Sequence, residues 1–133
     1  IGRSDRLSWK EIEEMQASGL ITFGSHTLSA TPLIDFKSES EVKRQIVESK
    51  RMLEAKLGRR VAAFSYPEGR FNEKIRQMVI GAGYELAVAT SPGRRYSPND
   101  LYLLKRLRIS ENAENLFVLW FETTGFYKYL KEK

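Results

Sequence analysis

The fold is decided by the stretch VAAFSYPEG, residues 61–69. Residues 61–66 predict a short strand, and the Pro-Glu-Gly that follows is a turn signal. A predicted helix comes next, from a cap at Asn72 to about Gly81, and residues 84–89 predict another strand. A strand, a helix and a second strand at this spacing indicate a parallel βαβ unit and therefore an α/β protein.

The sequence on both sides continues this alternation. The capping-box spacing from Ser8 to Glu11 predicts the start of a helix, and Gly19 ends it. The same spacing, from Ser38 to Glu41, predicts a long helix over residues 38–57. A buried strand is predicted over residues 20–24, a polar loop over 25–36, a second loop over 91–100 and an extended segment over 101–109. The last predicted element is a helical region that Asn112 or Asn115 caps. It reaches Leu130 and is interrupted near Gly125.

Length and composition place these elements in one domain. The chain has 133 residues, of which 41% are hydrophobic and 29% charged, as is typical of a folded globular domain. We therefore expect residues 1–133 to form a single domain. In parallel α/β sheets the loops at the carboxyl ends of the strands carry the chemistry, so the loops that follow residues 20–24 and 61–66 are the candidate site.

Composition also excludes several kinds of site and partner. The chain has no cysteine, which excludes thiolate chemistry, and its single histidine, His26, excludes a metal cage of several histidines from this chain. The strongest apolar run, residues 116–121, is much shorter than the ~20 residues of a membrane-spanning helix, so no membrane span is predicted. The net charge of +5 favours acidic partners, but the basic residues are dispersed and match no nucleic-acid motif, so we expect no nucleic-acid binding.

Several segments, in a fixed order, resemble one known family. They are SWKEIEEM and SGLI (residues 8–15 and 18–21), TFGSHTLSA (22–30), AFSYPEGRFN (63–72), GAGYELAVAT (81–90) and LKRLRI (104–109). Over about residues 8–110 the chain resembles the polysaccharide deacetylases of carbohydrate esterase family four, also called the NodB-homology domain. The resemblance implies a deformed (β/α) barrel, of which this chain is a partial or truncated version, the C-terminal part of a larger domain.

The resemblance also implies an activity and a cofactor. Family members remove acetyl groups from N-acetylated polysaccharides with a divalent metal, commonly zinc, which an aspartate and two histidines hold. His26 and Thr27 match the first half of the family's His-Thr-x-x-His loop, and Ala30 stands at the position of the second histidine. His26 is therefore the one implied metal ligand. The family's paired aspartates, one of which is the catalytic base, belong to a segment upstream of Ile1, so the catalytic residues of this chain are unknown.

A second loop also resembles a loop of the family. Tyr66-Pro67-Glu68-Gly69 resembles the family's Tyr-Pro-Tyr-Gly loop, with Glu68 in place of the second tyrosine. The resemblance assigns substrate binding to Tyr66, Pro67, Glu68 and Gly69, and a backbone N–H at position 68 would stabilise the oxyanion. Arg106 matches a basic position in the last family-like strand and is expected to orient a carboxylate or the substrate.

Three functions remain open at this point. The first is hydrolysis of N-acetyl groups on a glycan by the complete protein, with these residues inactive by themselves. The second is a non-catalytic relative that binds a glycan or a protein, which Ala30 and Glu68 favour. The third, a nucleic-acid-binding module, rests on net charge alone. Family members act on cell-wall, capsular or biofilm glycans, so the resemblance implies an extracytoplasmic or cell-envelope location.

An incomplete barrel has an open edge. The chain begins at Ile1 without a signal sequence, so we expect a processed product or a fragment of a longer protein. Too few strands are predicted to close a barrel, and an open parallel edge exposes unpaired backbone groups. We therefore expect a missing N-terminal segment or a homo-oligomer to cover that edge.

Aromatic residues at helical spacing have two interpretations. They form either a platform on which sugars stack or part of the core, and the core is the favoured interpretation. These residues are Trp9, Phe117, Trp120 and Phe121.

Overall fold

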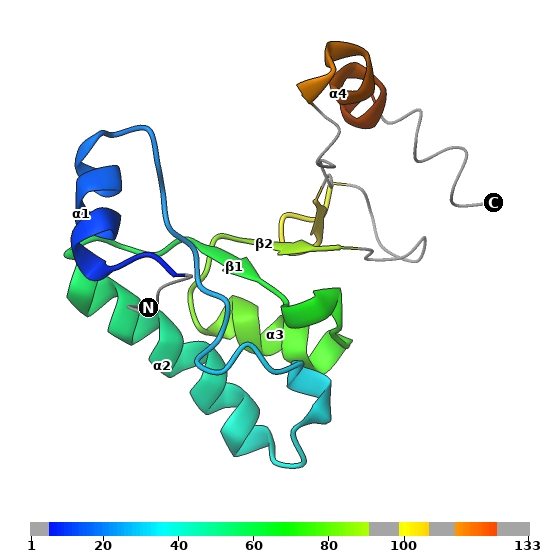
Figure 1. Cartoon of the computed structure of the whole chain (residues 1–133). Helices are drawn as coiled ribbons and strands as arrows, with labels where there is room; N and C mark the ends of the chain where they lie inside the picture. The colour runs from blue at the N-terminus through cyan, green and yellow to red at the C-terminus, as the bar shows by residue number, and fades with distance from the viewer. Residues whose placement is uncertain (1–5, 91–98, 107–113, 125–133) are drawn as a thin grey trace.

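In the part of the chain that the structure describes, three parallel strands form a sheet in the order β1-β2-β3 (Figure 1). The structure is a computed structural model that describes residues 6–90, 99–106 and 114–124. The predicted α/β class and the unit β1-α3-β2 are confirmed. The elements are α1 (Trp9–Ala17), the 3-10 turn η1 (Leu33–Asp35), α2 (Glu39–Leu57), β1 (Ala63–Ser65), the 3-10 turn η2 (Pro67–Gly69), α3 (Glu73–Gly81), β2 (Leu86–Ala89), β3 (Leu104–Lys105) and α4 (Leu116–Thr123).

One face of the sheet packs against α2 and α3 (Figure 1). Phe64 of β1 and Ala87 and Ala89 of β2 are buried there. The ring of Tyr84 lies 5.1 Å from that of Phe64, and its hydroxyl donates to the carbonyl oxygen of Ile46 at 3.1 Å. Burial raises the pKa of Tyr84 above its ordinary value of 10.0. The alternate strand residues, on the opposite face, are only half buried: Ala63, Ser65, Leu86 and Val88.

Three predicted helix starts are confirmed. At α1 the Ser8 hydroxyl accepts from the Glu11 N–H at 3.3 Å, and the Glu11 carboxylate accepts from the Ser8 N–H at 2.7 Å. Asn72 caps α3 and Asn115 caps α4, each accepting a first-turn N–H at 2.9 Å. These bonds satisfy N–H groups that have no partner within the helix.

The capping box predicted at Ser38 is wrong, although α2 begins where expected. The Ser38 hydroxyl pairs with that of Ser40 at 2.6 Å and caps no N–H. Glu41 accepts instead from Arg44, at 2.7 and 2.9 Å, and from the side-chain amide of Gln45 at 3.1 Å. These donors lower the pKa of Glu41 to about 2. Charge-assisted bonds along the helix have therefore replaced the cap.

The buried strand predicted over residues 20–24 is also wrong. This segment approaches β1 through one bridge, between Ser25 and Phe64. Leu20 and Ile21 are 87% and 39% exposed. A parallel strand is stable when it is paired and covered on both faces. In the described part of the chain β1 lies on one side of residues 20–24, and no strand pairs with their other side.

The C-terminal elements are described only in part. The extended segment predicted over 101–109 contains the two residues of β3, and residues 107–109 lie outside the described part. The loop residues 91–98, Asn112 and the helical region beyond Thr124 also lie outside it. Of the two predicted caps for the last helix, Asn115 is the one that the structure shows. No helix in the described ranges is long and apolar enough to cross a membrane.

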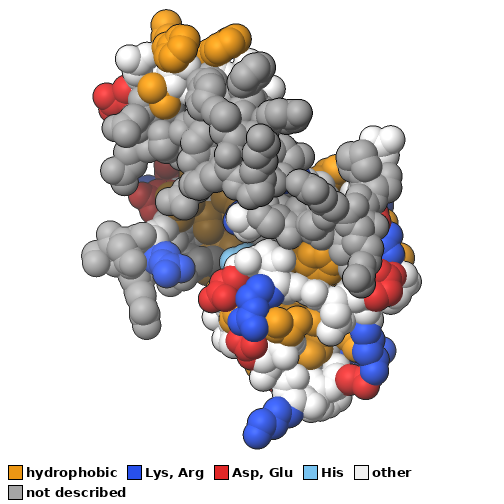
Figure 2. Space-filling view, turned by 90° about the vertical axis from the view of Figure 1, so that its right-hand side faces the viewer, with side chains coloured by type: hydrophobic (Ala, Val, Ile, Leu, Met, Phe, Trp, Pro, Cys, Tyr) orange, Lys and Arg blue, Asp and Glu red, His pale blue; other side chains and the backbone are white. Residues whose placement is uncertain are grey.

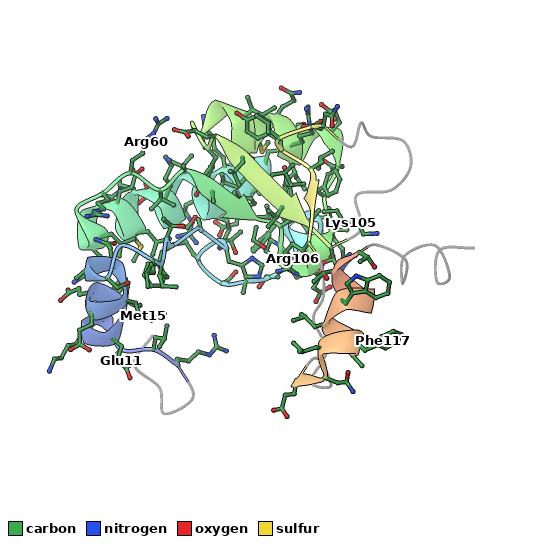
Figure 3. All side chains as sticks on the ribbon, turned by 90° about the horizontal axis from the view of Figure 1, so that it is seen from above. Glu11, Met15, Arg60, Lys105, Arg106 and Phe117 are labelled. Atoms are coloured by element: carbon green, nitrogen blue, oxygen red, sulfur yellow. The ribbon has the colours of Figure 1, made fainter. Side chains whose placement is uncertain are left out.

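The aromatic residues divide between two environments. Trp9 is half buried against the core, as predicted. Phe117 and Trp120 are 71% and 56% exposed, so the prediction that they belong to the core is wrong. Phe117 projects from the outer side of α4, where its ring lies 6.0 Å from that of Trp120 (Figure 3). The side chain of Phe121 lies outside the described part of the structure.

Candidate functional site

Four polar residues gather where parallel strands end. His26 follows the bridge residue Ser25, Tyr66 follows β1, Thr90 follows β2 and Arg106 follows β3. Because the strands are parallel, these ends meet at one edge of the sheet, which is where α/β proteins place ligands.

Backbone pairing fixes His26 beside β1. The Ser25 N–H donates to the carbonyl of Ala63 at 2.9 Å, and the Ser65 N–H donates to the carbonyl of Ser25 at 2.8 Å. The Nδ1 atom of His26 lies 2.8 Å from the carbonyl oxygen of Ser65. Since a carbonyl only accepts, Nδ1 carries a proton, which in a neutral imidazole leaves the lone pair on Nε2. Metal-binding imidazoles are oriented in this way, and part of the ring is visible at the surface (Figure 2).

Backbone strain is concentrated around this imidazole. Within the described ranges, three residues other than glycine have positive φ: Thr27 at 65°, Ala30 at 59° and Glu68 at 54°. Two of them follow His26 and the third lies in η2. Such a φ is unusual for a β-branched residue, and strained residues cluster at functional sites. The strain therefore favours a site between these two loops.

The turn that follows β1 leaves one backbone donor available. The N–H of Tyr66 donates to Val88, that of Gly69 donates to Tyr66, and Pro67 has no N–H. The Glu68 N–H has no acceptor among the described residues. It is therefore the donor in this turn that a ligand oxygen can take. The side chain of Tyr66 is fully buried, with its ring packed against those of Phe64 and Phe71, so contact with a ligand would come from its backbone.

The carboxylate of Glu68 points to a basic neighbour. It lies 3.7 Å from Arg70, whose guanidinium also pairs with Asp35 at 3.3 Å. All three side chains are largely exposed, so these ion pairs contribute little to stability. They do direct the Glu68 charge toward a cation.

Arg106 reaches the same turn through Thr90. Its backbone N–H donates to Ala89 at 3.1 Å, and its guanidinium donates to the Thr90 hydroxyl at 3.2 Å. Thr90 lies directly against Gly69, because a Cβ at Gly69 would be 2.8 Å from the Thr90 nitrogen. Figure 3 shows Lys105 and Arg106 at the end of β3. The structure thus brings a guanidinium to the loop that contains the Glu68 N–H.

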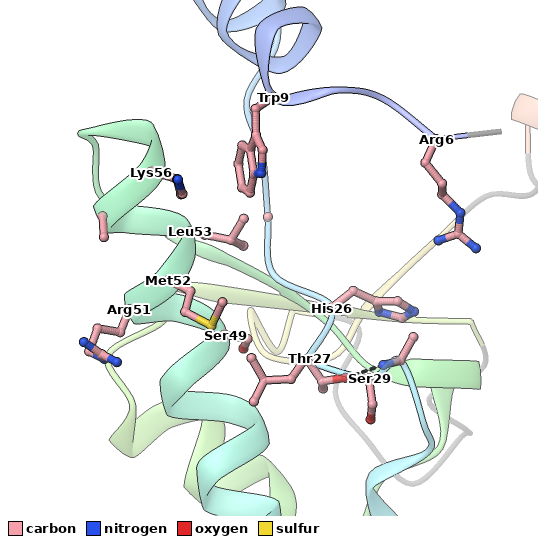
Figure 4. Close-up of a pocket in the computed structure, with 14 residues that line it drawn as sticks. Arg6, Trp9, His26, Thr27, Ser29, Ser49, Arg51, Met52, Leu53 and Lys56 are labelled. Carbon is pink, nitrogen blue, oxygen red and sulfur yellow. Dashed lines mark hydrogen bonds between the residues drawn. The ribbon is translucent and has the colours of Figure 1, made fainter. Parts of the chain in front are cut away.

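An open cavity of about 830 Å³ lies beside His26 (Figure 4). Trp9 lies toward one end of it and His26 toward the other. The Lys56 ammonium is 5.7 Å from the centre of the Trp9 ring, a cation–π distance. The charged side chains in the described lining are all basic: Arg6, Arg51 and Lys56. Arg51 is paired with Glu48 at 2.7 Å, whereas the Lys56 ammonium faces the indole. An indole beside a cation suits a ligand with hydroxyl groups.

The described residues do not fit the expected metal. Zinc sites use three or four protein ligands. In residues 6–90, 99–106 and 114–124 no three His, Cys, Asp or Glu side chains lie close enough to hold an ion together. Ala30 offers no donor atom, which leaves the single imidazole of His26.

Sequence reasoning missed two residues of this region, Gln45 and Ser49. Both lie on α2, are 4% and 3% exposed, and contact the segments on either side of His26. A signal was available in the sequence, since both fall beside Val42 and Ile46 on the apolar face of the helix. Polar residues on a buried face require a partner, but the sequence does not say which one.

Known proteins similar in sequence are polysaccharide deacetylases. A family profile described as polysaccharide deacetylase matches residues 1–87. The putative polysaccharide deacetylase YxkH of Bacillus subtilis (strain 168) is 28% identical over 110 residues, which are 83% of this chain and 39% of that protein.

Solved structures of similar fold include deacetylases. The Streptococcus pyogenes deacetylase PplD in complex with acetate is 31% identical with a TM-score of 0.75, over 87% of this chain and 51% of that one. BC0361, a polysaccharide deacetylase from Bacillus cereus, is 29% identical with a TM-score of 0.70, over 82% and 34%. IcaB from Ammonifex degensii shares the fold at 21% identity, with a TM-score of 0.73, over 92% and 57%. The chain thus spans between 34% and 57% of these structures.

Proposed function

Because this chain belongs to the polysaccharide deacetylase family, we propose that it serves the hydrolysis of N-acetyl groups on a polysaccharide. In that reaction water adds to the amide carbonyl carbon, the C–N bond breaks, and acetate and a free amine are released. Members of the family are generally metal-dependent. We propose that these 133 residues supply part of the machinery and that the catalytic carboxylates and the further metal ligands come from outside them.

The observation that carries this proposal is the edge shared by His26, the Glu68 N–H and Arg106. The N–H would donate to an oxygen that becomes negative in the tetrahedral intermediate, and such donors contribute strongly to acyl transfer. The Arg106 guanidinium would hold a hydroxyl or carboxylate of the glycan. His26 presents Nε2 outward with its ring fixed by Ser65. Acetate, which the streptococcal relative binds, is the acyl product of such a reaction.

A non-catalytic glycan-binding relative is the second candidate, and one specific observation favours it. Ala30 removes a donor at the position where the family resemblance implies a ligand, while the cavity beside it keeps Trp9 and three cations. A protein of this kind would hold a glycan against the indole without cleaving it.

Acetate release tests the expected inactivity of these residues by themselves. We expect the purified chain, supplied with zinc and N-acetylglucosamine oligomers, to release no more acetate than buffer with zinc. The physical reason is that one imidazole is too few ligands to hold the ion. Direct binding of the same oligomers, followed by quenching of tryptophan fluorescence, reports on the second candidate. Acetate release that a chelator abolishes would overturn the expected inactivity, and release lost in His26→Ala would place it at this site.

A further inference from the structure

Two buried polar side chains of α2 reach the backbone on both sides of His26. Gln45 and Ser49 lie four residues apart, and therefore on one face of the helix. Ser49 contacts Ser25, the residue that precedes His26. Gln45 contacts residues 28–29, which follow it. The segment that carries the imidazole is thus held at two points by one helix.

The side-chain oxygen of Gln45 accepts three hydrogen bonds. Its Oε1 accepts from the N–H of Leu28 at 3.0 Å, from the N–H of Ser29 at 3.1 Å and from the hydroxyl of Ser29 at 3.2 Å. Its Nε2 donates to Glu41 at 3.1 Å. Because a carboxylate only accepts, this contact fixes which end of the amide faces the loop. A glutamate is ionised at neutral pH, and its hydrogen bonds with Arg44 and Gln45 lower the pKa of Glu41 further.

Ser49 links the Ser25 end of the segment to the core through hydrogen bonds. The Ser25 hydroxyl donates to Ser49 Oγ at 2.8 Å, and the Ser49 hydroxyl donates to the Ile46 carbonyl at 2.9 Å. The Tyr84 hydroxyl donates to that same carbonyl. Ser25 is 1% exposed, so this chain of bonds is shielded from water and its loss leaves buried groups unsatisfied.

We infer that Gln45 and Ser49 are positioning residues for His26. Thr27 and Ala30 hold left-handed φ values, which persist only where surrounding contacts enforce them. Within the loop itself, the Thr27 hydroxyl accepts the Ala30 N–H at 3.1 Å (Figure 4). The two α2 side chains add a constraint on each side of His26, and together with the backbone pairing to β1 they keep Nδ1 of the ring on the Ser65 carbonyl. The inference rests on the His26 site of the proposed function. Its test, however, measures the tautomer of the His26 ring and the amide exchange of the loop, and it needs no acetate release.

The single histidine makes the test direct. Long-range ¹H–¹⁵N NMR of the full chain in alkaline buffer reports one imidazole, and we expect the native protein to show the Nδ1–H tautomer. Gln45→Leu and Ser49→Ala should each shift the ring toward the Nε2–H form. Loss of the bonds to Gln45 should also speed amide exchange at Leu28 and Ser29 by about tenfold. Ser49→Ala removes a single oxygen, so it keeps the test decisive if Gln45→Leu does not fold.

Matched variants separate positioning from general stability. Gln77 on α3 also donates to a glutamate four residues earlier, at 2.8 Å, but is exposed, so Gln77→Leu is the control and should leave the tautomer unchanged. The double variant E41Q/Q45E keeps an acceptor for the loop and reverses the Gln–Glu bond at the same net charge, so it should restore the Nδ1–H form. An unchanged tautomer in both Gln45→Leu and Ser49→Ala, or no rescue by the double variant, overturns the inference.

Discussion

Replacing Ala30 by histidine is expected to raise the zinc affinity of the chain by about 100-fold. The gain arises because a second imidazole on the same loop binds an ion that His26 has already captured, so its effective concentration is high. Ala30 lines the same cavity as His26, and histidine is among the residues that adopt positive φ more readily than most. Isothermal titration calorimetry with zinc measures the change.

Two matched variants give this prediction its controls. Ala55 lines the same cavity from α2, so Ala55→His adds an imidazole without the loop geometry and should gain little. In the double variant H26A/A30H the gain should disappear, because one imidazole remains. Equal affinities for Ala30→His and Ala55→His would show that the loop does not present the two positions to one ion.

Substitution of Gly69 by alanine is expected to destabilise the fold by about 3 kcal/mol, as the sum of two effects. The first is left-handed strain at φ 69°, about 1–2 kcal/mol for a residue with a Cβ. The second is overpacking, about 1–3 kcal/mol, because the new methyl would lie 2.8 Å from the Thr90 nitrogen and 3.0 Å from its side chain. Urea unfolding, followed by circular dichroism, measures the loss.

Gly58 provides the matched control for Gly69. It ends α2 with φ 63°, and no atom lies within 4 Å of a Cβ placed there. Gly58→Ala should therefore show only the strain, about 1 kcal/mol. If the two variants lost the same free energy of unfolding, the close approach of the η2 turn to Thr90 would not be the constraint described above.

The sequence predicted the elements whose signals are local. The caps at Ser8, Asn72 and Asn115 were predictable because each depends on a side chain and an N–H within one helical turn. The Ser38 cap failed because Glu41 had a stronger donor available in Arg44, and a spacing rule does not rank competing partners.

The features that could not be predicted from the sequence depend on residues far away along the chain. Residues 20–24 have strand-forming composition, but a strand forms only where another backbone pairs with it, and β1 offers one bridge. His26 was predictable from its motif, whereas its tautomer depends on the Ser65 carbonyl, 39 residues away. The roles of Gln45 and Ser49 require the loop to be folded back on α2, which no local pattern encodes.

The zinc content of the purified chain, measured by elemental analysis after incubation with zinc and dialysis, shows whether His26 belongs to a complete metal site. We propose that it is a single imidazole ligand, with no donor atom at Ala30. We therefore expect far less than one zinc per chain, because no three possible ligand side chains lie together in the described residues. One zinc per chain, retained through dialysis and lost in His26→Ala, would contradict this proposal.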